Sequence, residues 1–179
     1  MKTRHKLSRV LTAAVALAVV SGAAWASPDQ CGRIGTWFGS AGSPTPILTW
    51  FGVDTEGKND KNGEMILDWV FVDPTWGNPN FSLATRLTGG RGVWEKIHKN
   101  EYKYTWYAYG IMNNGFPLYS IRVSGFVSQA DCDQAGIDYT VEFFVPPVAP
   151  QNMSMPGVTP VGVHTGTATE TRVPLVVTP

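Results

Sequence analysis

Residues 101–127 read EYKYTWYAYGIMNNGFPLYSIRVSGFV, and this stretch decides the fold class. Aromatic and β-branched residues alternate with other side chains on both sides of Asn113-Asn114-Gly115. Asn and Gly tolerate the positive φ angles that a tight turn requires. The pattern therefore predicts a β-hairpin with strands over residues 101–111 and 116–127.

The rest of the chain has the same character. Its 13 prolines and 19 glycines separate short segments rich in aromatic and β-branched residues, and helical periodicity is hard to find. Further strands are expected at 33–39, 47–53, 64–72, 81–88, 93–98 and 137–145, and 161–177 is a candidate for a last one. We expect an all-β fold, an antiparallel up-and-down barrel of about 8–9 strands, with a β-sandwich as the alternative. The barrel is preferred because closure removes sheet edges, and few charges are present to protect them.

The N-terminus has the pattern of a secretion signal. Residues 1–9 are basic, residues 10–20 are almost wholly apolar but too short to span a bilayer, and Ala24-Trp25-Ala26 supplies the small residues of a cleavage site. We therefore predict a signal peptide over residues 1–26 and a periplasmic or secreted protein. An uncleaved N-terminal anchor is the alternative.

The remaining chain divides into a β-barrel domain at 27–147 and a Pro/Thr-rich C-terminal strand or tail at 148–179. The whole chain carries 14 basic and 14 acidic side chains, and four of the basic ones lie in the signal, so the mature protein has a net charge of −4. Such a surface attracts neither nucleic acid nor anionic lipid. No later segment is apolar for long enough to span a membrane.

Cys31 and Cys132 are the two cysteines of the chain. In an oxidising compartment an even number indicates a disulfide, here one that closes a loop of about 100 residues and stabilises by roughly 4–5 kcal/mol before strain. The alternative is a pair of buried free thiols.

Gly35-Thr36-Trp37 on the first predicted strand resembles the calycin superfamily of lipocalin-like and avidin-like barrels. In that family a Gly-x-Trp closes one barrel end, which implies that Trp37 packs across the floor. Ile137-Asp138-Tyr139 matches two of the three residues that lipocalins carry before their seventh strand. Arg172 is the only candidate for the family's late arginine.

Residues 35–43 are also similar to the first strand of avidins, which implies a ligand-binding role for Ser43. Gly39 stands where that family needs a polar side chain, which argues against biotin as the ligand.

The candidate ligand site is the inner face of the barrel. Tyr102, Tyr104 and Trp106 share one face of their strand, and an aromatic-lined interior suits a small apolar or aromatic molecule. The predicted ligand-binding residues are Trp69, Asp68, Tyr102, Tyr104, Trp106 and Arg122. The polar side chains expected to point inward are Asp68, Arg86, Arg122 and Glu142. The alternatives are a filled aromatic core and polar side chains that face water.

Several chemistries are excluded by the residues available. After the signal only His98 and His164 remain as histidines, far apart in the sequence, so no metal site is predicted. No nucleophile elbow, phosphate loop or dinucleotide fingerprint is present, and no cofactor is expected.

Three functions remain open. The first is an exported barrel that binds a small apolar or aromatic molecule. The second is a cofactor-free enzyme on the same scaffold, a cyclase, isomerase or hydratase that uses Tyr and carboxylate groups as acid and base. The third is a structural or assembly protein with a filled core. A cavity above about 300 Å³ favours the first two.

Overall fold

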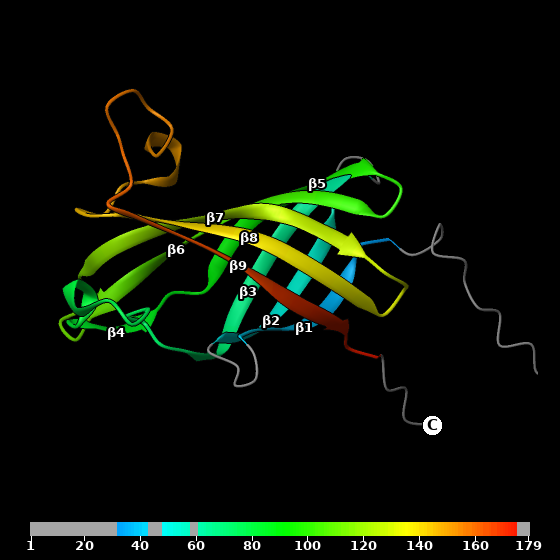
Figure 1. The fold of residues 1–179 in the computed structure, drawn as a ribbon, viewed down its shortest axis with the longest axis horizontal. Helices are drawn as coiled ribbons and strands as arrows, with labels where there is room; N and C mark the ends of the chain where they lie inside the picture. Colours follow the sequence, from blue (N-terminus) through cyan, green and yellow to red (C-terminus); the bar gives the residue numbers. More distant parts are fainter. Residues whose placement is uncertain (1–31, 43–47, 58–60, 175–179) are drawn as a thin grey trace, which may run out of the picture.

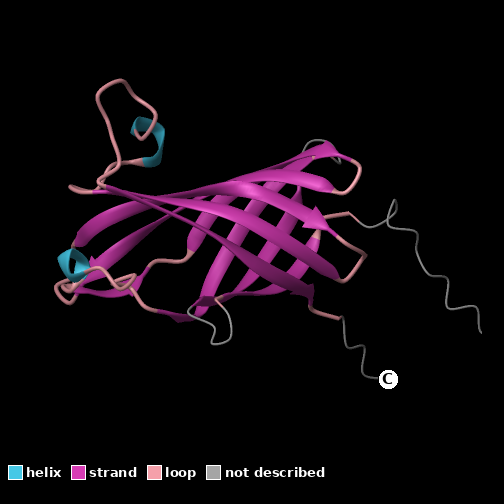
Figure 2. Cartoon of the chain, viewed as in Figure 1, coloured by secondary structure: helices cyan, strands magenta, loops and turns pink. Residues whose placement is uncertain are grey.

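A computed structural model describes residues 32–42, 48–57 and 61–174, and nearly all of its regular structure is β-strand (Figures 1 and 2). The strands are β1 (Gly35–Ala41), β2 (Leu48–Glu56), β3 (Asn62–Val72), β4 (Ala84–Leu87), β5 (Gly90–His98), β6 (Glu101–Met112), β7 (Pro117–Gln129), β8 (Gln134–Phe144) and β9 (Gly162–Arg172). Two short 3₁₀ helices, η2 (Pro79–Phe81) and η3 (Pro150–Asn152), lie in loops.

The sheet closes on itself. Strands β1, β2, β3, β5, β6, β7, β8 and β9 each pair antiparallel with the next, and β9 returns to pair with β1 as well as β8. Strand β4 pairs with β6 beyond the end of β5, so it lies outside the closed ring. The predicted up-and-down barrel is confirmed, and the sandwich alternative is wrong.

Alternation along β6 shows how the sequence specifies the barrel wall. Tyr102, Tyr104, Trp106 and Ala108 are buried on its inner face, as the pattern predicted. At Gly110 the ring of Tyr119 from β7 takes the place of a side chain, because an added Cβ would lie 2.1 Å from it. The barrel therefore fills its interior with rings from one strand that lie over glycines of the next.

Two predicted segments differ from the observed ones. The segment 81–88 is split, because Pro79 begins η2 and the Asn78 side chain accepts a hydrogen bond from Asn80 N, so β4 starts only at Ala84. The last candidate segment does form a strand, β9, which completes the barrel from within the predicted strand or tail at 148–179.

The barrel has two different ends. At the mouth end, on the left in Figure 1, lie loops 73–83, 113–116 and 145–161. At the closed end, on the right, lie the segment 32–34 and the turns 99–100 and 130–133. None of the helices among the described residues is both long and apolar enough to cross a membrane.

Candidate functional site

The mouth end holds a pocket of about 610 Å³ between loop 73–83 and strands β8 and β9. This volume is within the range of about 300–1,000 Å³ usual for small-molecule sites. Its lining is mostly apolar and comes from four segments: Phe71 and Val72, Trp76 and Phe81, Tyr139 and Phe143, and Val163 and His164.

Loop 73–83 is shaped by its first residue. The Asp73 carboxylate accepts hydrogen bonds from Thr75 Oγ1 at 2.7 Å, from Thr75 N at 2.9 Å and from Gly77 N at 3.3 Å. The hydrogen bonds from Thr75 lower the pKa of Asp73. Asp73 therefore acts as an ionised staple of the loop.

Trp76 holds this loop over the mouth. Its φ of 52° lies in the left-handed region, which a bulky residue rarely adopts. The indole N donates to the Tyr119 hydroxyl at 3.1 Å, and that hydroxyl donates to Pro74 O. The ring also meets Phe143 edge-on, with centroids 5.6 Å apart. The loop conformation thus depends on contacts with the barrel interior.

Beneath the mouth pocket, the barrel interior contains a separate cavity of only about 30 Å³. Leu48, Trp76 and Tyr139 line both spaces and separate them. The interior is filled largely by aromatic rings, among them Trp69 and Trp106 with centroids 5.3 Å apart. A cavity of this size holds one or two waters. The expectation of a wide hollow inside the barrel is therefore wrong, and the space for a ligand lies at the mouth.

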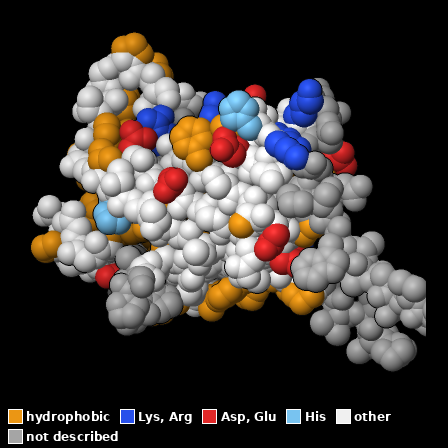
Figure 3. Space-filling view, turned by 45° about the vertical axis from the view of Figure 1, so that its right-hand side comes forward, with side chains coloured by type: hydrophobic (Ala, Val, Ile, Leu, Met, Phe, Trp, Pro, Cys, Tyr) orange, Lys and Arg blue, Asp and Glu red, His pale blue; other side chains and the backbone are white. Residues whose placement is uncertain are grey.

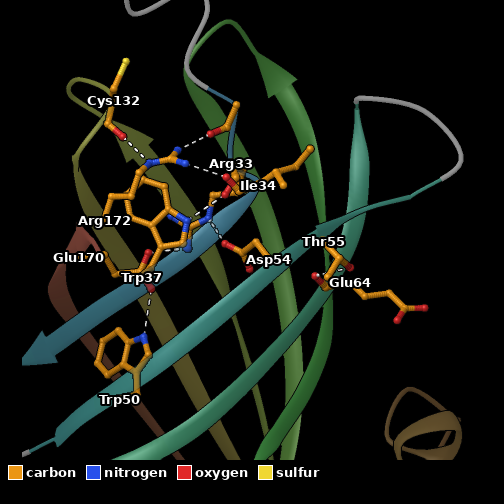
Figure 4. Close-up of polar contacts among 11 residues, drawn as sticks. Arg33, Ile34, Trp37, Trp50, Asp54, Thr55, Glu64, Cys132, Glu170 and Arg172 are labelled. Atoms are coloured by element: carbon orange, nitrogen blue, oxygen red, sulfur yellow. Dashed lines mark hydrogen bonds and ion pairs between the residues drawn. The ribbon is translucent and has the colours of Figure 1, made fainter. Parts of the chain in front are cut away.

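Three charged side chains are buried together near the closed end (Figure 4). Arg33 Nε lies 2.6 Å from Asp54 Oδ2, and Arg33 Nη2 donates to Glu170 Oε2. Trp50 Nε1 donates to Glu170 Oε1 at 3.0 Å. Burial raises the pKa of Asp54 to about 7, opposed by the charge of Arg33 and increased by that of Glu170. The three groups therefore form a coupled cluster of one cation and two carboxyls.

Trp37 seals this end between two arginines. The guanidinium carbons of Arg33 and Arg172 lie 4.6 and 4.5 Å from its ring centroid, within cation–π range. Its Nε1 donates to Arg33 O at 2.8 Å. The position expected for Trp37, across the barrel floor, is the one observed, and Arg172 is the late arginine that covers it (Figure 4).

Arg172 also ties three backbone segments together. It donates to the carbonyl oxygens of Gly32 at 2.6 Å, Ile34 at 2.7 Å and Cys132 at 2.7 Å. Cys31 itself, like Ser43, lies outside the described residues. The disulfide stays a prediction, but Arg172 brings the residue after Cys31 and the backbone of Cys132 to one side chain.

Of the predicted ligand-binding residues, Trp69, Tyr104 and Trp106 line the small interior cavity. Tyr102 is buried toward the closed end, where its ring meets Trp94 edge-on at 5.7 Å. Asp68 is exposed on the outer surface. None of these residues lines the mouth pocket.

The expected inward direction of Asp68, Arg86, Arg122 and Glu142 is wrong. Arg122 and Glu142 form a two-pronged ion pair on the outside of β7 and β8, at 2.6 and 3.0 Å, and Arg86 is exposed. Each of these side chains has apolar neighbours along its strand, but those neighbours occupy the opposite face.

Sequence reasoning missed the charges that are buried, Arg33, Asp54 and Glu170. A signal was present in β2, where Asp54 continues the alternate series Leu48, Trp50 and Gly52 on the inner face. No group of three or more metal-ligating side chains occurs among the residues that the structure describes.

Fold and site together define a closed antiparallel barrel of eight strands with a sealed, charged floor and an apolar pocket at its mouth. In comparisons with known proteins, no family model, no curated protein and no solved structure matches the chain.

Proposed function

We propose that this protein binds a small apolar or aromatic molecule in the mouth pocket. The observation that carries the proposal is the size and lining of that pocket, about 610 Å³ with aromatic side chains from the loop and from both flanking strand pairs. Apolar pockets of this size with a few polar groups are typical of small-molecule sites. The predicted signal peptide makes it a carrier or sensor outside the cytoplasm.

The polar groups of the pocket favour a ligand without negative charge. Asp73 is ionised and turned toward its own loop, and the lining includes no Lys or Arg. The Tyr139 and His164 rings, whose centroids lie 6.1 Å apart, supply hydrogen-bonding groups from β8 and β9. An uncharged aromatic molecule with one hydrogen-bonding group matches this lining.

An acid–base enzyme has less support. The two buried carboxyls, Asp54 and Glu170, are engaged by Arg33 near the closed end. Burial raises the pKa of Tyr104, which keeps its hydroxyl neutral. Neither carboxyl lines the mouth pocket.

The arrangement at the floor supports relating the barrel to the calycins. Trp37 of the Gly-x-Trp tripeptide packs across the closed end, and Arg172 near the end of the last strand covers its ring. We propose this relationship on the strength of that pair.

The test is titration with N-phenyl-1-naphthylamine, an uncharged aromatic probe whose fluorescence rises in apolar surroundings. We expect saturable binding that Gly162→Leu weakens at least tenfold, because Gly162 lines the pocket and an added Cβ meets only Phe143 at 3.8 Å. Gly136→Leu is the matched control, since Gly136 lies on the outer face of β8, where an added Cβ meets only Ser128 O at 4.0 Å.

Two results would contradict the proposal. One is the absence of saturable binding to the unmodified protein. The other is equal weakening by both glycine variants, which would place the probe somewhere other than the mouth pocket. Native mass spectrometry of protein purified from its own host then identifies the natural ligand.

A further inference from the structure

The large apolar side chains that the structure exposes are concentrated at the mouth end. We call this set the apolar rim; its members are Phe71, Leu83, Phe116, Val145, Met155, Val161 and Val163. Phe116 is 67% exposed, Leu83 64% and Val163 60%. Scattered single apolar residues need no explanation, but a group from several segments at one end of a molecule marks an interaction surface.

Charge is distributed in the opposite way. Loops 73–83, 113–116 and 145–161 contain a single charged residue, Asp73, whose carboxylate is bonded within its own loop. The described turns and segments at the closed end carry the charged residues Arg33, Lys61, Lys99, Asp131 and Asp133. Figure 3 shows hydrophobic side chains at the tip of the projecting loop at the upper left, and a group of Lys and Arg side chains at the upper right.

The projecting loop 145–161 is held in place by the barrel. Arg122 Nη1 donates to Ser154 Oγ at 2.7 Å, Val148 N donates to Ser120 Oγ at 2.8 Å, and the Met153 side chain is buried. Met155 and Val161 nevertheless remain exposed. The loop is therefore anchored with apolar side chains turned outward, although its anchored residues show that the barrel had partners to offer.

We propose that the apolar rim docks on the surface of a lipid bilayer with uncharged headgroups, and that the mouth pocket receives its ligand there. This proposal rests on the proposed function of the pocket. Apolar and aromatic side chains from separate loops can enter the boundary between headgroups and acyl chains, as those of interfacial proteins do. Because the rim loops contain no Lys or Arg, attraction to anionic lipid contributes nothing there.

The contact also explains why rim and pocket share residues. Phe71 and Val163 belong to the rim and line the pocket. An apolar ligand that leaves the acyl region at these side chains enters the pocket without crossing water. The bilayer is therefore both the docking partner and the source of the ligand.

The test is sedimentation of the protein with vesicles of phosphatidylcholine, alone and with one quarter phosphatidylglycerol. We expect similar partitioning to both vesicles, insensitive to added salt. The double variant Leu83→Ser/Phe116→Ser should lower the partition coefficient at least tenfold. The matched control is Val93→Ser, which removes an equally exposed side chain from the outer face of β5, away from the rim.

Each outcome decides the matter. Absence of binding to either vesicle overturns the proposal, as does binding confined to the anionic vesicles and abolished by salt. Equal loss by Val93→Ser also overturns it, and rim-dependent self-association without vesicle binding would assign the rim to a second copy of the chain. Binding of N-phenyl-1-naphthylamine without lipid, measured on the same samples, reports the pocket separately. The proposed function stands if the probe binds while the vesicles do not.

Discussion

The guanidinium carbon of Arg172, at the end of the last strand, lies 4.5 Å from the centre of the Trp37 ring in the first strand. This contact joins the two ends of the described chain at the closed end of the barrel. The same guanidinium donates to three backbone carbonyls. It therefore satisfies polar groups that the irregular segment 32–34 and the turn before β8 leave unpaired.

Replacement of Arg172 is expected to cost more stability than its partial exposure indicates. Arg172→Ala removes the cation–π contact and three charge-assisted hydrogen bonds, so we expect the free energy of unfolding to fall by about 2–4 kcal/mol. Arg172→Lys should recover less than half of the loss, because an ammonium cannot copy the planar fork. Urea unfolding followed by tryptophan fluorescence measures both.

The matched control for Arg172 is Arg122→Ala. Arg122 pairs with Glu142 on the outer surface at 2.6 Å, in water-exposed surroundings. Such pairs contribute about 1 kcal/mol or less. Equal losses for the two arginines would contradict the role assigned to Arg172.

The buried cluster predicts that the protein is less stable at higher pH. The pKa of Asp54 is about 7 in the folded state because of burial, whereas an unfolded Asp titrates near pH 3.9. Between those values the folded protein holds a proton that the unfolded chain has released. Stability therefore falls as pH rises through this window and levels off above about pH 7, by about 2–4 kcal/mol in total from this group.

Asp54→Asn tests this dependence. The variant keeps a side chain of the same shape and leaves Arg33 with a single ionised partner, Glu170. We expect its free energy of unfolding to vary less with pH between about 5 and 8 than that of the unmodified protein. Parallel pH curves for the two proteins would show that Asp54 is not the titrating group.

The Tyr119 hydroxyl is expected to control the lid loop. Tyr119→Phe leaves Trp76 Nε1 and Pro74 O without their partner, which costs about 1–3 kcal/mol where water cannot replace it. Amide hydrogen exchange of residues 73–81 should accelerate, while exchange in β6 and β8 changes little. Tyr107→Phe, at a half-buried position of β6, provides the control; unchanged exchange in the Tyr119 variant would contradict the prediction.

The disulfide prediction can be checked directly. Peptide mapping without reduction should recover the peptides of Cys31 and Cys132 as one linked species. A reductant should lower the free energy of unfolding by roughly 4–5 kcal/mol, as expected for a loop of about 100 residues. Two separate peptides with free thiols would establish the alternative.

The fold class was predictable because inner and outer residues alternate with the period of a strand, most clearly in β6 and β7. Closure was predicted from the scarcity of edge protection, and the structure agrees, since β9 pairs with both β1 and β8. Trp37 was placed correctly because its tripeptide resembles a known floor motif.

The site was less predictable, for physical reasons. Whether aromatic rings enclose a space or fill it depends on how they interdigitate, as where Gly39 lets the Trp50 ring lie over it, with an added Cβ only 2.1 Å from that ring. Alternation alone also cannot tell which charges point inward when apolar residues flank both faces, so Asp68 and Arg122 were assigned to the wrong side. The mouth pocket depends on loop 73–83, whose shape follows from Asp73 and Trp76 and not from any period.

The pairing of the first strand with the last has a consequence for how the chain is made. Until β9 is available, β1 and β8 each present an unpaired edge, and Arg33 lacks its partner Glu170. A nascent chain cannot complete its sheet before nearly all of it has been synthesised, and such long-range pairing is slow. The barrel thus remains open for as long as translation lasts, which is the state that a translocation channel for unfolded polypeptides accepts.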